Sequence, residues 1–190
     1  MKLVMVVGAA TPPGRLNNAI ETLAEALTGR PDRASETINL AGSGIEICDG
    51  RKLEDYSAPT RAAVDAVLAA DAVLLASPVY RASFPGVLKN LLDLLPVEAL
   101  RDKPVGILAM GGSAHHYLGV DWHLRMVLTW FGALVMPTSV YLTGRDFTDG
   151  KLSSADGRTD LLALADTLFA FAESGKGKSF GPTPLAARFT

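Results

Sequence analysis

Short apolar runs alternate with amphipathic helical patterns along most of the chain, and this alternation constrains the fold more than any other feature. Strands are predicted where apolar runs are continuous, and helices where apolar residues recur every three or four positions. The five strand segments are 2–8, 34–40, 72–77, 105–110 and 134–142, the last interrupted by Pro137. The five helices are 16–27, 60–70, 85–95, 117–131 and 154–171. Buried strands that alternate with helices form a parallel sheet covered on both faces.

This pattern fits a flavodoxin-like, doubly wound α/β fold, with a five-stranded parallel sheet in the order 2-1-3-4-5 and helices on both faces. Right-handed crossovers bring the loops that follow the strands to one edge of such a sheet. Three of these loops begin at Gly8, Ser77 and Met110. Ligands of open α/β sheets bind at that edge, so these loops are where we expect the functional site.

Length and composition narrow the class of protein. The 190 residues predict one domain over 1–173, followed by a tail over 174–190 that is either mobile or laid on a partner subunit. A net charge of −2 argues against binding to nucleic acid, because such proteins usually carry a basic excess. The mean hydropathy of +0.23 is high for a water-soluble chain and suggests that a second subunit covers some apolar surface.

The cellular setting is predicted from the cysteine count and the apolar runs. Cys48 is the only cysteine of the sequence, so no intrachain disulfide forms and a reducing cytoplasm is the simplest location. The longest apolar run, over 3–10, has eight residues, far below the roughly 20 that a membrane span needs. We interpret it as the first buried strand and not as a signal peptide, because Pro12-Pro13-Gly14 follows at once.

The first loop, over 8–18, joins a strand to a helix and suits an anion. Free backbone N–H groups at a helix N-terminus bind phosphate. Thr11 and Asn17 add neutral donors, and Arg15 adds a charged planar fork. The loop carries neither a Walker motif nor Gly-x-Gly-x-x-Gly. Taken alone, it is equally consistent with an ordinary helix start and one solvated arginine.

The second and third loops suit a flat ring. After Ser77, the loop presents Pro78, Val79 and the aromatic residues Tyr80 and Phe84, which either cover a ring face or pack beneath the loop. In the third loop, Gly111 and Gly112 allow a backbone to approach a ligand closely. The N-terminus of the helix that follows can stabilise negative charge developing on that ligand.

These residues resemble the NADPH-dependent FMN reductases of the flavodoxin-like superfamily, and most of all the group that supplies reduced flavin to alkanesulfonate-type monooxygenases. The resemblance covers residues 2–142. One matched block follows the third strand and consists of Pro78, Tyr80, Pro85-Gly86, Leu88-Lys89 and Leu92-Asp93. The other is the turn with Gly111, Gly112, Ser113 and His116. The phosphate loop departs from the family pattern, since Ala9 and Thr11 replace a serine and an arginine, and Asn17 and Asn18 replace later serines.

The resemblance implies a site and an activity. Thr11, Arg15 and Asn17 would hold the FMN phosphate, and Pro78, Val79 and Tyr80 would line the isoalloxazine edge. Gly111, Gly112 and Ser113 would face the other side of the flavin, with His116 beside it. Hydride would pass from nicotinamide C4 to flavin N5, and FMNH₂ would leave for a partner monooxygenase. The resemblance also implies a homodimer or homotetramer.

Several alternatives remain open in the sequence. The same loops serve a quinone, azo, nitro or metal-ion reductase with tightly bound FMN. A flavodoxin-type electron carrier is disfavoured by the net charge of −2 and by the lack of a Thr/Ser-rich phosphate loop. The donor is NADPH or NADH, and three arginines are candidates for contact with the 2′-phosphate of NADPH: Arg15, Arg81 and Arg125.

The remaining notable side chains are three histidines, one thiol and two tryptophans. No cysteine or carboxylate completes a metal site with His115, His116 and His123, and Cys48 lacks a CxxC partner, so neither metal nor thiol chemistry is expected. A tryptophan stripe runs along the helix predicted over 117–131 and consists of Leu118, Trp122, Met126 and Trp130. The stripe is either core or a subunit contact. Contact is the sharper hypothesis, because Val120, Leu124, Val127, Leu128 and Phe131 already supply a face for the sheet.

Overall fold

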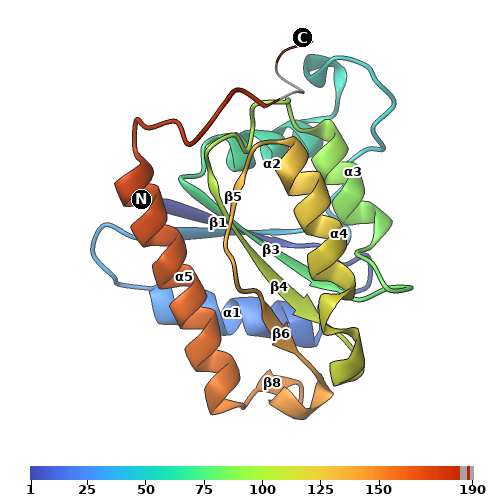
Figure 1. Ribbon diagram of the computed structural model, residues 1–190. Helices are drawn as coiled ribbons and strands as arrows, with labels where there is room; N and C mark the ends of the chain where they lie inside the picture. Colours follow the sequence, from blue (N-terminus) through green and yellow to red (C-terminus); the bar gives the residue numbers. More distant parts are fainter. Residues whose placement is uncertain (185–187, 189–190) are drawn as a thin grey trace.

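In the computed structural model, which describes residues 1–184 and 188, a parallel sheet lies between two layers of helices (Figure 1). Its strand order is β2-β1-β3-β4-β5, as predicted, with β6 also paired to β4. The strands are β1 (Lys2–Val7), β2 (Ala34–Asn39), β3 (Ala72–Pro78), β4 (Pro104–Met110), β5 (Leu134–Val135) and β6 (Val140–Leu142). Strands β1, β3 and β4 are almost wholly buried, which explains their continuous apolar sequences.

The helices divide between the two faces of the sheet and create two cores. Helices α2 (Ala58–Leu68), α3 (Gly86–Leu94) and α4 (Tyr117–Trp130) cover one face. Helices α1 (Arg15–Leu27) and α5 (Ala155–Gly175) cover the other. Three short 3₁₀ helices, η1 (Leu53–Asp55), η2 (Ala114–His116) and η3 (Gly144–Asp146), lie in the connections. Most of the predicted inner face of α4 is buried, with Val120, Leu124 and Leu128 fully inaccessible, whereas Val127 is half-buried.

The edge of the sheet next to β4 is formed by two short strands. β5 pairs with the first part of β4 and β6 with the last part, and residues 136–139 separate them. Pro137 lies in that break, where its missing N–H costs no ladder hydrogen bond. The single extended segment predicted over 134–142 is therefore interrupted where the sequence places the proline.

A small hairpin follows β6, in a stretch where the sequence predicts no element. Strands β7 (Phe147–Thr148) and β8 (Lys151–Leu152) pair around Asp149 and Gly150, which have φ values of 49° and 80°. Asp-Gly is a favoured pair for a two-residue hairpin turn. The Asn18 side chain donates to the Gly150 carbonyl at 2.7 Å and so ties the hairpin to α1.

The last helix is longer than predicted and runs to Gly175. Beyond it the chain returns across the amino-terminal end of the sheet (Figure 1). There the Phe180 N–H donates to the Asp102 carboxylate at 3.0 Å. This end lies opposite the loops expected to form the site. Part of the predicted tail, residues 185–187 and 189–190, lies outside the described residues. Within the described residues, no helix combines the length and apolarity that crossing a membrane requires.

Candidate functional site

The loops after β1, β3 and β4 meet at the carboxyl edge of the sheet, as predicted. Each loop is tied by its first residues to a neighbouring strand. The Gly8 N–H donates to Ala76 O at 2.7 Å, the Val79 N–H to Met110 O at 2.8 Å, and the Gly111 N–H to Leu142 O at 3.0 Å. These bonds fix the bases of the loops relative to one another and leave their tips at the surface.

A hollow of about 330 Å³ lies where the first loop meets α1. Thr11, Arg15 and Asn17 all line it, together with Pro78 of the second loop and Met110 of β4. The N-terminus of α1 has no side-chain cap and no acidic residue in its first turn. Arg15, the first residue of the helix, is exposed and forms no ion pair within the described residues. A cation at this end opposes the helix dipole, so the hollow favours an anion.

Asn17 has partners of its own in this hollow. Its side chain is buried, accepts a hydrogen bond from the Asn39 side chain at 2.9 Å and donates to the Glu21 carboxylate at 2.6 Å. Asn39 lies at the end of β2 and also lines the hollow. No local sequence pattern identifies Asn39, because its pairing with Asn17 depends on the β1–β2 register. One amide hydrogen of Asn17 remains available to a ligand.

The Arg15 guanidinium lies against a segment that is distant in sequence. A Cβ placed on Gly144 of η3 would lie 3.3 Å from Arg15 Nη1. A capping box fixes η3, because the Thr143 hydroxyl accepts from Arg145 N while the Asp146 carboxylate accepts from Thr143 N. The η3 segment therefore limits the positions open to Arg15, a role that no local sequence pattern reveals.

A second hollow, of about 810 Å³, opens between the loop after β2 and the start of α3. It adjoins the first two loops of the site, because it is lined by Ala10 of the first loop and by Tyr80 and Phe84 of the second. The two aromatic residues of the second loop differ in whether they pack beneath the loop or remain free to cover a ring face. Phe84 packs against the core, whereas Tyr80 is 43% exposed. Tyr80 is therefore the aromatic ring available to a ligand.

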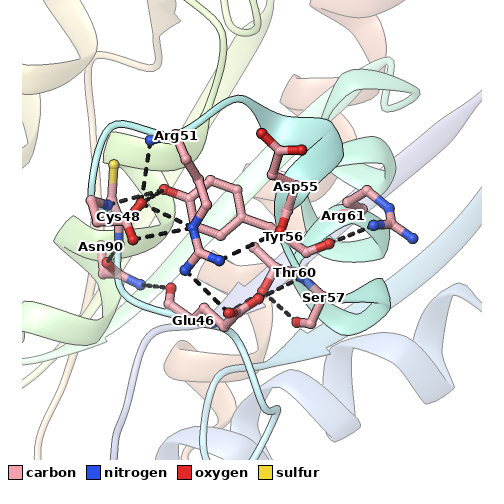
Figure 2. A network of polar contacts seen from close by, with 10 residues as sticks. Glu46, Cys48, Arg51, Asp55, Tyr56, Ser57, Thr60, Arg61 and Asn90 are labelled. Carbon is pink, nitrogen blue, oxygen red and sulfur yellow. Dashed lines mark hydrogen bonds and ion pairs between the residues drawn. The ribbon is translucent and has the colours of Figure 1, made fainter.

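A polar network in the loop over 41–57 adjoins this second hollow, which Cys48 and Asn90 of the network line (Figure 2). The Asn90 side chain of α3 donates to Glu46 O at 2.9 Å and accepts from Cys48 N at 2.8 Å. Arg51 lies over the Tyr56 ring and pairs with Glu46 at 3.2 Å. The hydrogen bond from the Ser57 backbone lowers the pKa of Glu46, with smaller contributions from the Ser57 side chain and Arg51. Apart from η1 the segment is irregular, as predicted, and these contacts tie it to α3.

The third loop rests on a tyrosine of the sheet. Tyr141 in β6 donates its hydroxyl hydrogen bond to Ser113 O at 2.7 Å, and burial raises the pKa of this phenol. A Cβ on Gly111 would meet the same hydroxyl. Gly112 is exposed, with open space where a Cβ would point. The first glycine therefore packs inward, and the second offers its backbone to the surface.

The histidines lie beside this loop. His115 and His116 are exposed in η2, and Ser113 Oγ lies 3.4 Å from His116 Nδ1. Among the described residues, no group of three or more histidine, cysteine or carboxylate side chains is arranged to hold a metal ion.

Comparisons with known proteins show the family of the chain. The family described as NADPH-dependent FMN reductase matches residues 1–148. An "FMN reductase (NADPH)" of Pseudomonas aeruginosa is 36% identical over 155 residues, which cover 80% of this chain and 82% of the relative. The "NADH-dependent FMN reductase SfnF" of Pseudomonas fluorescens is 34% identical over 154 residues, covering 81% and 82%. A solved structure titled as the apo form of NADH:FMN oxidoreductase (EMOB) has a TM-score of 0.70 at 28% identity, covering 96% of this chain and 92% of the other.

Proposed function

Because the chain belongs to the NADPH-dependent FMN reductase family, it is an oxidoreductase that reduces FMN with NAD(P)H, and we propose that the three loops at the carboxyl edge form the site of that reaction. The two cofactors supply the chemistry, which is hydride transfer from nicotinamide C4 to flavin N5. The protein's tasks are to bind, to orient and to exclude water. One observation carries the assignment of the site: the uncapped, cation-bearing start of α1 adjoins the loops after β3 and β4.

The first hollow fits the phosphate of FMN. Its donors are the free N–H groups of the first turn of α1, the Thr11 hydroxyl, the remaining Asn17 amide hydrogen and the Arg15 guanidinium. Charge-assisted bonds from Arg15 supply the strongest single interaction of this set. Asn39 and Glu21 keep the Asn17 amide in place, and Gly144 limits the positions of Arg15.

The second and third loops fit the flavin ring. Pro78 ends β3 and Val79 follows it, both half-buried, and Tyr80 is exposed in the turn beyond them. Across from them, Gly112 has no side chain to obstruct a planar ligand, and Ser113 and His116 border the same turn. Open backbone N–H groups of this turn would stabilise negative charge near N1 of the reduced ring.

We further propose that FMN is a substrate which leaves after reduction. Arg15 is the one cationic side chain among the residues that line the first hollow, and the proposed phosphate donors Thr11 and Asn17 are neutral. Weak retention of the flavin allows FMNH₂ to reach a flavin-dependent monooxygenase. We place the enzyme in the cytoplasm, where NAD(P)H is available and where the lone thiol of Cys48 stays reduced.

A homo-oligomer completes the proposal. All four residues of the tryptophan stripe are exposed, with Trp122 and Met126 each 65% accessible. A groove of about 410 Å³ lies beside the stripe between α3 and α4, lined by Met126, Trp130 and Leu92 among others. Exposed apolar patches of this kind usually contact a partner, and aromatic residues are enriched in interface cores. A second copy of the chain is the partner we propose.

A titration of NADPH and NADH oxidation against added FMN tests this function. We expect the purified protein to be colourless and the rate to saturate with free FMN. A yellow protein that oxidises NAD(P)H only with a quinone, azo, nitro or metal-ion acceptor would instead establish a reductase with tightly bound FMN. Failure to oxidise NAD(P)H under any of these conditions would contradict the proposed function.

A further inference from the structure

The loop after β3 begins with a two-residue turn whose backbone is unusual for the residues that form it. The Tyr80 N–H donates to Ser83 O at 2.7 Å and the Ser83 N–H to Tyr80 O at 3.0 Å, so Arg81 and Ala82 are the central residues. Both have positive φ, 51° for Arg81 and 62° for Ala82. Glycine and asparagine adopt this backbone readily, whereas other residues are strained in it.

The hairpin between β7 and β8 has the same kind of turn with a favourable sequence. There the two central residues, Asp149 and Gly150, also have positive φ, and Asp-Gly is a preferred pair for such a turn. The Arg81-Ala82 turn lacks both preferred residues. Strain of this kind persists only where the surrounding structure imposes it, and it clusters at ligand sites.

The strained turn packs against the first part of α4. The Ala82 backbone lies against Gly119, where an added Cβ would be 3.1 Å from Ala82 O and 3.3 Å from Ala82 C. Gly119 is within the helix, where glycine is less favourable than alanine. The contact between the Ala82 backbone and Gly119 therefore combines two locally unfavourable features, a strained turn and a glycine within a helix.

The turn presents an unpaired cation at the edge of the site. Arg81 is exposed and, within the described residues, has neither an ion-pair partner nor a side-chain hydrogen bond. The other two candidates for a nucleotide phosphate are committed elsewhere. Arg125 binds the Asp121 carboxylate at 2.7 and 3.0 Å and Pro137 O at 3.1 Å. Arg15 lines the FMN phosphate hollow at the start of α1, on the opposite face of the sheet from α4.

We propose that Arg81 binds a phosphate group of the nicotinamide nucleotide, and that the strained turn fixed on Gly119 holds it in position. The inference rests on the proposed function, because it takes the loops as the flavin site. The FMN phosphate is assigned to the hollow on the α1 side of the sheet. Arg81 lies on the α4 side, so the phosphate group that it binds belongs to NAD(P)H. A guanidinium binds phosphate oxygens as a planar fork, which lysine cannot reproduce.

Steady-state kinetics of Arg81→Gln tests the assignment directly. We expect the KM for NADPH to rise at least about tenfold, with kcat and the KM for FMN nearly unchanged. Arg81→Lys should be intermediate. Parallel assays with NADH identify the phosphate: an equal rise for both donors assigns Arg81 to the pyrophosphate, and a rise for NADPH alone assigns it to the 2′-phosphate.

Ala82→Gly tests the role of the backbone strain, because it keeps the charge of Arg81 and places at position 82 a residue that adopts positive φ without strain. We expect a higher Tm together with a higher KM for the nucleotide. Far-UV circular dichroism controls for folding.

Unchanged KM values for both nucleotides in a folded Arg81→Gln enzyme would overturn the role of Arg81 while leaving FMN reduction intact. A wild-type protein without NAD(P)H:FMN activity would instead refute the proposed function itself.

Discussion

The Tyr141 hydroxyl donates a hydrogen bond to the Ser113 carbonyl oxygen at 2.7 Å and fills the space that a side chain on Gly111 would need. Tyr141 of β6 thereby fixes the position of the loop after β4. The neighbouring glycine, Gly112, is free of such contacts and faces open space. Two adjacent glycines thus have different physical reasons for lacking a side chain, and substitutions at the two positions should separate them.

Gly111→Ala should destabilise the protein itself. The new Cβ would clash with Tyr141 Oη, so the loop or the tyrosine must move and the bond to Ser113 is lost. Loss of a buried hydrogen bond together with overpacking costs about 1–3 kcal/mol. A fall in the free energy of urea unfolding, measured without flavin, checks this. An unchanged value would show that the loop is not fixed by Tyr141.

Gly112→Val should leave the unliganded fold intact and abolish flavin binding. The space around Gly112 accepts a side chain in the free protein, but that side chain would stand where we place the flavin ring. Circular dichroism and Tm should match the wild type, while fluorescence titration should detect no FMN binding. If the folded variant binds FMN normally, the third loop does not belong to the site.

Trp122→Glu should change the oligomeric state without unfolding the chain. Trp122 is 65% exposed, so a charge at this position meets solvent in a monomer but is buried without a partner in the proposed subunit contact. Light scattering should report a species of lower mass than the wild type. Leu124→Glu, at a fully buried position of the same helix, is the control expected to unfold. Wild-type mass for Trp122→Glu would place the interface elsewhere.

Lys103 should give the protein a stability that rises with pH in the alkaline range. Burial lowers the pKa of Lys103 to about 8, an effect that Asp71 opposes, and its ammonium donates to Val67 O and Leu68 O at the end of α2. Between pH 8 and about 10.4 the unfolded chain binds more protons at this residue than the folded chain. The free energy of unfolding therefore increases with pH in that window. Below it, the charged, buried Lys103 destabilises the folded state by its full amount.

Urea unfolding of wild type and Lys103→Met at pH 7.5 and 9.5 isolates this effect, because all other groups titrate equally in both proteins. The stability of the wild type relative to the variant should increase by about 1 kcal/mol over that interval, after allowance for partial solvent exposure. Identical pH slopes for the two proteins would show that the ammonium is not desolvated.

Continuous apolar strands and amphipathic helices made most of the fold predictable, because burial on both faces of a parallel sheet leaves a local signature. The carboxyl-edge loops follow from that topology, and so does the placement of Arg15 and Tyr80. Tyr141 and Gly144 escaped prediction because each acts on a loop distant in sequence. The hairpin around Asp149 and Gly150 did carry a local signal in its Asp-Gly pair.

The loop over 41–57 shows a different limit. Its composition predicts an irregular segment, which is what the structure contains, but its partners on another element are not predicted. Asn90 of α3 bonds to both Glu46 and Cys48, and no spacing within the loop indicates that contact. The irregular backbone of this loop is therefore anchored to α3 by side-chain hydrogen bonds that only the fold reveals.

The affinity of Arg15→Ala for FMN and for riboflavin tests the central claim most directly. Arg15 lines the first hollow and forms no ion pair within the described part of the chain, so its charge is available to a phosphate. Removal of its charge-assisted bonds should cost about 1.5–3 kcal/mol, which lowers FMN affinity at least about tenfold. Riboflavin lacks the phosphate, and its affinity should hardly change. Equal losses for the two flavins, or no loss for either, would contradict the assignment of this edge of the sheet as the FMN site.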